Sequence, residues 1–174
     1  MKILITGLSG AGKSSVIEAL ATLGHRAVDL DDDGWSIWLP CTANSTGAKP
    51  DHDWLWHERR LTDLLSGHTE GPLFLGGCAP NMGRFTPHFD RVVLLRACLD
   101  LLLDRVSRRT GNQYGKTARE ARQIAANHDT VEPLLRRAST HEVDADRALE
   151  VVGADVLAIA DTSEDARSGD GRCI

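Results

Sequence analysis

Residues 7–14 read Gly7-Leu8-Ser9-Gly10-Ala11-Gly12-Lys13-Ser14, which fits the pattern G-x-x-x-x-G-K-[ST] without a mismatch. The apolar run from Lys2 to Thr6 precedes it and has the character of a buried strand. In the segment that follows, up to Leu23, the apolar residues are spaced along one helical face. A strand, a glycine-rich loop and a helix in this order predict a phosphate-binding loop.

The residue types in this loop suit a nucleoside triphosphate. Glycines let the backbone approach a phosphate without a side chain in the way. Lys13 can bridge the outer phosphates as a point charge, and the Ser14 hydroxyl can ligate Mg²⁺. The residues expected to bind the triphosphate here are Gly7, Leu8, Ser9, Gly10, Ala11, Gly12, Lys13, Ser14 and Ser15.

Length and composition predict one ordinary globular domain. The chain has 174 residues and a formal net charge of −5, which argues against a broad surface for nucleic acid or for an acidic membrane. Its four cysteines show no metal-ligand spacing, and no stretch is long enough to span a bilayer, so we expect a cytoplasmic protein. We expect a folded domain over residues 1–160, a polar, disordered tail over residues 161–174, and a monomer or homodimer.

An acidic cluster follows the second predicted strand, which covers residues 26–30. Asp29 ends this strand region, and Asp31, Asp32 and Asp33 follow it directly. Carboxylates beside a phosphate site can hold Mg²⁺ or take a proton from an acceptor hydroxyl. The same residues could form only an acidic turn, and the pattern leaves open which aspartate acts.

The region between residues 35 and 84 is expected to hold the acceptor. All four tryptophans lie between residues 35 and 56, where they could wall a pocket or simply pack in the core. Asp51 is expected to cap a helix over residues 52–67 that carries Trp54 and Arg59. A third strand over residues 72–75 ends in a glycine pair, which permits close approach of a ligand or makes a turn. The polar residues Asn81 and Arg84 lie in the segment after this pair.

Basic residues gather near a glycine-containing loop over residues 108–116. A helix is predicted over residues 98–109, and Lys116 ends the loop. Arginines on such a loop can close over a triphosphate as a lid, or they can be solvated side chains at a helix end. A fourth strand over residues 91–95, a helix over 117–138 interrupted at Pro133, a strand over 140–144 and a helix over 148–159 complete the chain. Five strands that alternate with helices predict a parallel sheet.

These features together resemble the nucleoside-monophosphate-kinase-like group, to which shikimate kinase, gluconate kinase and adenylate kinase belong. The resemblance covers about residues 1–160, and it looks closest to shikimate kinase. The Asp-x-Asp motif of that enzyme is matched by both Asp29-Leu30-Asp31 and Asp31-Asp32-Asp33. Its three glycines are represented only by Gly76-Gly77, and Cys78 stands at the third position. The resemblance implies a three-layer αβα fold with strand order 2-3-1-4-5, a helical lid over about residues 105–120, and phosphoryl transfer from ATP that depends on Mg²⁺.

The residue roles follow from this resemblance and from the chemistry. Lys13, Asp31 and Arg109 are expected to be catalytic, and Ser14 and Asp31 to hold the metal. Arg105, Arg108 and Arg109 are expected to contact ATP from the lid. The residues expected to bind a small-molecule acceptor are Asp29, Asp31, Trp54, Arg59, Gly76, Gly77, Asn81 and Arg84. The alternatives are a nucleoside monophosphate kinase, which would hold the acceptor phosphate with Arg59 and Arg84, and a non-catalytic nucleotide-dependent switch.

Overall fold

A computed structural model describes residues 1–32, 34–41, 49 and 51–162 of the chain. Its centre is a sheet of five parallel strands in the order β2-β5-β1-β6-β7. The strands are β1 (Lys2–Thr6), β2 (Arg26–Asp29), β5 (Leu73–Gly76), β6 (Arg91–Arg96) and β7 (His141–Asp144). The order differs in numbering from the predicted 2-3-1-4-5 because two strands outside this sheet, β3 (Ser36–Pro40) and β4 (His52–Trp56), were not predicted.

The inner strands of the sheet are continuous apolar runs because helices cover both of their faces. Ile3, Leu4 and Ile5 of β1 are completely buried, as are the residues Leu73 to Leu75 of β5. Strand β1 lies between β5 and β6 in parallel register, with Ile5 opposite Gly76 and Thr6 opposite Leu94. The carboxyl ends of these strands therefore meet at one edge, where the phosphate loop begins.

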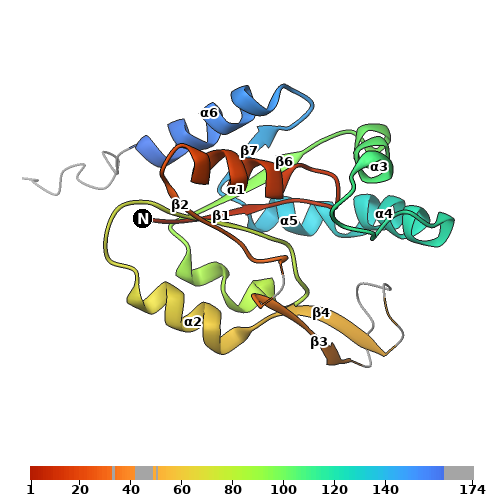
Figure 1. Ribbon diagram of the computed structural model, residues 1–174, viewed down its shortest axis with the longest axis horizontal. Coiled ribbons are helices and arrows are strands. Elements are labelled where there is room, and N and C mark those ends of the chain that lie inside the picture. Colours follow the sequence, from red (N-terminus) through yellow and green to blue (C-terminus); the bar gives the residue numbers. More distant parts are fainter. Residues whose placement is uncertain (33, 42–48, 50, 163–174) are drawn as a thin grey trace, which may run out of the picture.

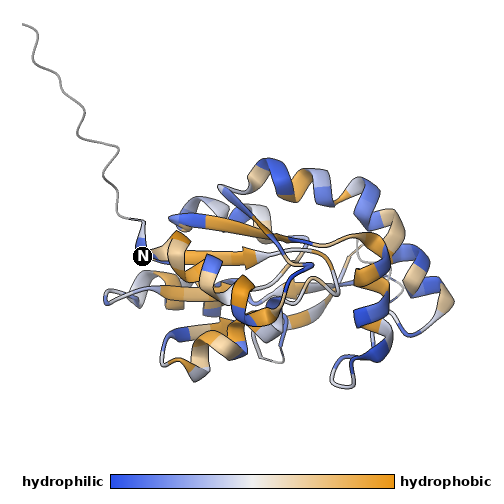
Figure 2. Cartoon of the chain, turned by 90° about the horizontal axis from the view of Figure 1, so that it is seen from above, coloured by the Kyte–Doolittle hydropathy of each residue, from blue (hydrophilic) through white to orange (hydrophobic). Residues whose placement is uncertain are grey.

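Helices lie on both sides of the sheet. Figure 1 shows α1 (Lys13–Thr22) and α6 (Leu149–Asp161) packed together on one side, with α2 (Glu58–Gly67) on the other side. The remaining helices are α3 (Leu99–Arg108), α4 (Ala118–Thr130) and α5 (Glu132–Ala138), with the short 3-10 turns η1 (Met82–Arg84) and η2 (Thr86–His88). Hydrophobic residues gather in the central strands, and hydrophilic residues are prominent on the outer helices (Figure 2).

The prediction of a helix over residues 52–67 was wrong for the first part of that range. Strands β3 and β4 form an antiparallel hairpin there, in which Trp38 pairs with Trp54 and Ser36 with Trp56. Aromatic residues at alternate positions suit a pleated strand, in which they share one face. Asp51 adopts a positive φ of 56° before the strand, and the actual N-cap of α2 is His57, whose side chain accepts a hydrogen bond from the Arg60 N–H.

The other expected elements are present with small shifts at their ends. The helix predicted over residues 117–138 is two helices, and the break falls at Val131, two residues before Pro133. Proline fits the first turn of α5 because its missing N–H has no partner there in any helix. The tail expected over residues 161–174 lies outside the described residues from 163 onward. In the described part of the chain, no helix has both the length and the apolar character needed to cross a membrane.

Candidate nucleotide and acceptor site

The phosphate loop lies between β1 and α1 and is packed against two other elements. Gly10 has a φ of +91°, and a Cβ atom there would lie 2.5 Å from the carbonyl oxygen of Leu102 in α3. A Cβ atom at Gly7 would lie 2.6 Å from the carbonyl oxygen of Leu95 in β6. Glycine is therefore required for the loop to reach this position. Gly12, the N-cap of α1, has no side chain to satisfy the first N–H groups of the helix, which leaves them for an anion.

Lys13 is folded back over this loop. Its Nζ donates to the Gly7 carbonyl oxygen at 3.0 Å and lies 3.5 Å from the Leu8 carbonyl oxygen and from Oδ2 of Asp31. The residue is buried, so these three acceptors replace its water. The ammonium group is thus held where the loop would receive phosphates. Ser14, the next residue, is exposed at the first turn of α1.

Asp31 is the member of the acidic cluster that the structure joins to the phosphate loop. Its Oδ1 accepts a hydrogen bond from the Cys78 N–H at 3.0 Å, and its own N–H donates to Oδ1 of Asp29 at 2.9 Å. The side chain of Asp31 is 25% exposed. Burial raises the pKa of its carboxyl group, while the charge of Lys13 and the Cys78 N–H act in the opposite direction. Asp29 thus supports the turn that carries Asp31, and Asp33 lies outside the described residues.

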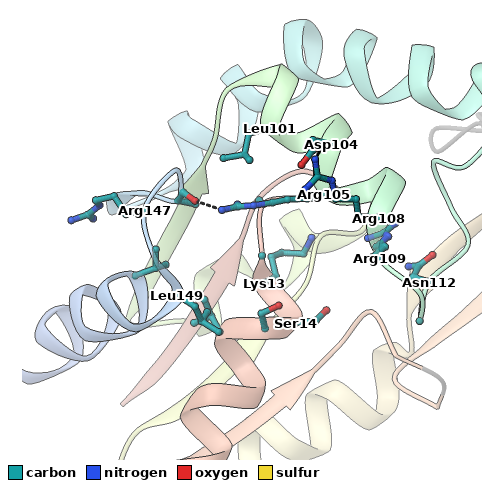
Figure 3. Close-up of a pocket in the computed structure, with 18 residues that line it drawn as sticks. Lys13, Ser14, Leu101, Asp104, Arg105, Arg108, Arg109, Asn112, Arg147 and Leu149 are labelled. Carbon is teal, nitrogen blue, oxygen red and sulfur yellow. Dashed lines mark hydrogen bonds and ion pairs between the residues drawn. The ribbon is translucent and has the colours of Figure 1, made fainter.

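A pocket of about 840 Å³ extends from the phosphate loop. The start of α1 forms one wall, α3 and the loop after it form the second, and the segment after β7 forms the third. Figure 3 shows Lys13 and Ser14 on one side and Arg105, Arg108 and Arg109 on α3 and just beyond it. The sequence reasoning missed the rest of the lining. It includes Leu101, Asp104, Ala145, Arg147, Leu149 and Val152.

A signal for the missed residues was present in the sequence. Ala145 to Leu149 follow the fifth parallel strand, and a ligand in such a sheet lies at the carboxyl ends of the strands. The last strand was predicted, but its carboxyl end was not used. Together with Leu101 and Val152, Leu149 adds apolar side chains to the lining of the pocket.

The three arginines of the predicted lid have different surroundings. Arg105 donates to the Ala145 carbonyl oxygen at 2.7 Å, and exposed Arg108 pairs with Asp104 at 2.8 Å. Arg109 donates through Nη2 to the Tyr114 carbonyl oxygen at 2.7 Å, and its Nε is buried without a hydrogen-bond partner in the described part of the chain. Burial lowers the pKa of Arg109, although the nearby charges, including Asp31, raise it. One donor of Arg109 therefore has no partner among the described residues.

The loop over residues 109–117 is held by its own polar groups. Lys116 was expected to add positive charge to the lid, but its Nζ donates to the carbonyl oxygens of Ser107 and Arg109 and so caps the end of α3. The Gly115 N–H donates to Glu120, whose side chain also forms a capping box with Thr117. Arg109 thus projects from a loop that the rest of the segment holds in place.

The two glycines after β5 have different neighbours, although both were expected to contact the acceptor. A Cβ atom at Gly77 would lie 3.0 Å from Oδ1 of Asp31 and from Cζ2 of Trp56, so this glycine lies beside the site. A Cβ atom at Gly76 would lie 2.5 Å from Cγ1 of Ile17, inside the contact between β5 and α1. The absent side chain of Gly76 thus serves the packing of the helix on the sheet.

The other residues expected at the acceptor lie beside Asp31 or next to one another. The Trp54 Nε1 is 3.4 Å from the Asp31 carbonyl oxygen. The Asn81 amide is occupied by the backbone of Trp56, since it accepts from the N–H at 3.1 Å and donates to the carbonyl oxygen at 3.0 Å. Arg84 is paired with Glu58, a residue that the sequence reasoning did not single out.

Arg59 is the remaining member of the expected acceptor set. It is exposed at the start of α2, and it makes no hydrogen bond or ion pair with the described residues. The structure therefore brings Asp31, Gly77 and Trp54 together but gives Gly76 and Asn81 packing and backbone contacts.

Fold and loop together define a P-loop α/β fold of the nucleoside-monophosphate-kinase-like type. Residues 3–128 match the model of the family described as "AAA domain", and the chain belongs to that family. A comparison with curated proteins finds no match.

Solved structures share the fold at low sequence identity. Shikimate kinase from Acinetobacter baumannii, in complex with shikimate, has a TM-score of 0.60 at 18% identity, with 91% of each chain covered. A gluconokinase from Sinorhizobium meliloti has a TM-score of 0.55 at 19% identity, covering 90% of this chain and 89% of that chain. Deoxyadenosine kinase from M. mycoides with bound dATP has a TM-score of 0.53 at 14% identity, covering 91% and 98%. At these identities the likeness shows the fold.

Proposed function

We propose that this protein is an ATP-dependent phosphotransferase that moves the γ-phosphate of ATP to a hydroxyl group of a small molecule. One observation carries the proposal: Nζ of Lys13 lies 3.5 Å from Oδ2 of Asp31, at the edge of a pocket that begins in the phosphate loop. A cation for the transferring phosphate is thus adjacent to a carboxylate for the acceptor. Phosphoryl transfer needs mainly this kind of positioning and charge neutralisation.

The nucleotide would lie along the pocket described above. The loop amides and Lys13 would hold its β- and γ-phosphates, and the apolar lining residues Leu101, Leu149 and Val152 would contact the base or the sugar. Arg109, which lines the pocket, would contact the transferring phosphate with its guanidinium group. The shikimate kinase, gluconokinase and deoxyadenosine kinase neighbours support this arrangement through their fold.

Ser14 and Asp31 would hold Mg²⁺ together with phosphate oxygens and water. The described residues contain no cluster of three or more acidic, histidine or cysteine side chains that could form a metal cage. One hydroxyl and one carboxylate fit an ion that keeps most of its coordination sites for water and phosphate. When bound, this ion would neutralise charge on the transferring phosphate.

Asp31 would accept or orient the proton of the acceptor hydroxyl. Its burial raises the pKa of the carboxyl group, which makes the carboxylate a better base than a solvated one. Its contact with Lys13 would be released when phosphates take over the ammonium group. The acceptor oxygen, the transferring phosphate and the carboxylate would then meet at one place.

The test is ADP formation with a panel of hydroxyl compounds and nucleotides, with and without Mg²⁺. We expect ADP only with ATP, Mg²⁺ and an acceptor, and loss of turnover in Lys13→Ala. Arg137→Ala is the matched control, because Arg137 is an exposed cation that lies outside the pocket. Normal turnover of Lys13→Ala, or equal turnover without any acceptor, would contradict the proposal.

A further inference from the structure

Three of the cations around the expected acceptor region are already engaged. Lys13 contacts Asp31, and Arg84 lies 2.6 Å from Oε1 of Glu58. Arg60 stacks on the ring of Trp35, with its guanidinium carbon 4.0 Å from the ring centre, and donates to the Gly34 carbonyl oxygen. An anionic acceptor would therefore have to displace one of these partners or use another cation, of which Arg59 is exposed, Arg109 lines the nucleotide pocket and Lys49 lies 5.8 Å from the ring centre of Trp38.

Glu58 is well placed to keep Arg84 occupied. It is the first residue of α2, where a carboxylate is favoured by the helix dipole. Its Oε1 accepts from Arg84 and also lies 3.4 Å from Nδ2 of Asn81. Asn81 is itself fixed on the Trp56 backbone, so the position of Glu58 is tied to the end of β4.

An aromatic row begins beside Asp31 and runs along one face of the hairpin. Ser36 pairs with Trp56, and Trp38 with Trp54, so all of these side chains project from the same face. The Trp54 indole reaches the Asp31 carbonyl oxygen, and the rings of Trp38 and Trp54 lie 5.1 Å apart. The Lys49 ammonium group lies over the Trp38 ring, but Trp38 is still 40% exposed, which leaves part of its ring to contact a ligand.

Together these contacts favour a ring-shaped ligand without negative charge. Indole faces stack on the apolar faces of sugars, cyclic polyols and aromatic rings. A carboxylate or phosphate would have to compete with Glu58 for Arg84, and like charges brought together in this way oppose binding. The same pair would cost a neutral acceptor nothing, because it can stay intact.

We propose that the acceptor is an uncharged, ring-bearing alcohol that stacks on Trp38 and Trp54, and that Glu58 excludes anionic acceptors by holding Arg84. The inference rests on the proposed phosphotransferase function, because only a phosphotransferase has an acceptor. It differs from the shikimate bound to one neighbour, which carries a carboxylate, and from a nucleoside monophosphate. It makes Glu58 a specificity-determining residue.

The test measures binding separately from turnover. All four tryptophans lie between residues 35 and 56, so intrinsic fluorescence reports on this end of the protein alone. A non-hydrolysable ATP analogue at saturation fills the nucleotide pocket, and compounds are then added in pairs that differ only in charge. Shikimate is compared with its methyl ester, and AMP with adenosine.

In the wild type we expect the neutral member of each pair to bind more tightly, by about tenfold. Glu58→Gln removes the negative charge and frees Arg84, so the charged member should gain about tenfold in affinity. Glu70→Gln is the control, because it removes the same charge from the segment that follows α2. Trp38→Ala should weaken the neutral ring compounds by about tenfold, whereas Leu39→Ala, on the opposite face of β3, should not.

The proposal is overturned if Glu58→Gln binds the charged compounds no better than the wild type does, or if the wild type prefers them. It is also overturned if Trp38→Ala and Leu39→Ala have equal effects. Failure of the phosphotransferase function would appear in the ADP assay and would leave these binding preferences measurable.

Discussion

Two adjacent glycines allow the site to be tested without touching a charged group. An alanine Cβ at Gly76 would lie 2.5 Å from Cγ1 and 3.2 Å from Cδ1 of Ile17, which is buried in α1. Overpacking of this kind costs about 1–3 kcal/mol, and the reduced entropy of the unfolded chain offsets about 0.4–1 kcal/mol of it. Gly76→Ala should therefore destabilise the protein by about 1–2 kcal/mol, which lowers the melting temperature by about 2–8 °C.

The same substitution at Gly77 should act on turnover. A Cβ there would meet Oδ1 of Asp31 and Cζ2 of Trp56 at 3.0 Å, so the carboxylate must move by a few tenths of an ångström. A misplacement of 1 Å can cost about a hundredfold in rate, so we expect a loss of about tenfold in turnover. Thermal unfolding and ADP formation, measured on both variants, separate the two effects.

A double-mutant cycle tests the reasoning for Gly76. Ile17→Ala removes the Cγ1 atom and should cost about 2–5 kcal/mol by itself. In the double variant the added methyl group fills part of that space, so the two effects should differ from additivity by about 0.5–3 kcal/mol. Additive effects, or a Gly76→Ala variant with normal stability and weakened acceptor binding, would refute the assignment of Gly76 to packing.

The remaining predictions concern the charged residues of the site. Lys13→Ala should lower turnover by more than about a hundredfold in ADP assays and leave the circular dichroism spectrum unchanged, because Lys13 supplies the positive charge that neutralises the transferring phosphate. Normal turnover of this variant would show that Lys13 has no such role. Activity should fall as the pH drops through the raised pKa of Asp31, above the ordinary range of an aspartate, and Asp31→Asn should abolish this acid limb of the pH–rate profile. Because the pKa of Asp31 is raised in the folded state, protonated Asp31 contributes to the free energy of unfolding at low pH, and this contribution is lost as the pH rises through that pKa. Asp31→Asn should remove this pH dependence from denaturant titrations, since its amide oxygen can still accept the hydrogen bond from the Cys78 N–H. Arg109→Ala should lower turnover more than it raises the nucleotide dissociation constant, and residues 108–116 should gain protection from hydrogen exchange when ATP and Mg²⁺ bind; unchanged exchange together with normal turnover would leave the segment as a solvated loop. Lys116→Met should lower turnover by about tenfold with little change in nucleotide affinity, because the cap on α3 that positions Arg109 is lost, and Lys116→Arg should restore part of it; equal losses in turnover and affinity would count against positioning.

The nucleotide half of the site could be predicted because its signal is local. The loop from Gly7 to Ser14 contains its own turn residues, its lysine and its hydroxyl, and the strand and helix beside it are contiguous in sequence. The three inner strands β1, β5 and β6 were likewise visible as apolar runs. The pairing of Lys13 with Asp31 could also have been predicted, because the carboxyl ends of parallel strands meet at one edge of the sheet.

The acceptor half was predicted less well because its residues are positioned by long-range pairing. Trp54 was predicted on a helix but lies on β4, because its alternation with Trp56 becomes informative only when Trp38 and Ser36 lie opposite. Gly76 and Gly77 are the same residue type at adjacent positions, and they differ only in which helix or loop lies against them. No local pattern distinguishes a glycine that packs on Ile17 from one that packs on Asp31.

The same distinction bears on how specificity would be built into this fold. The phosphate loop would contact atoms that every nucleoside triphosphate shares, so its requirements can be met by a short segment whose backbone does most of the binding. Recognition of the acceptor would instead depend on Glu58, Asn81 and Arg84, which come from two separate segments and meet only because the hairpin ends where α2 begins. A single change of charge at Glu58 would alter which acceptors fit without disturbing Lys13 or the loop. On this reasoning, chains that share the nucleotide half can differ in acceptor through the pairing of one arginine.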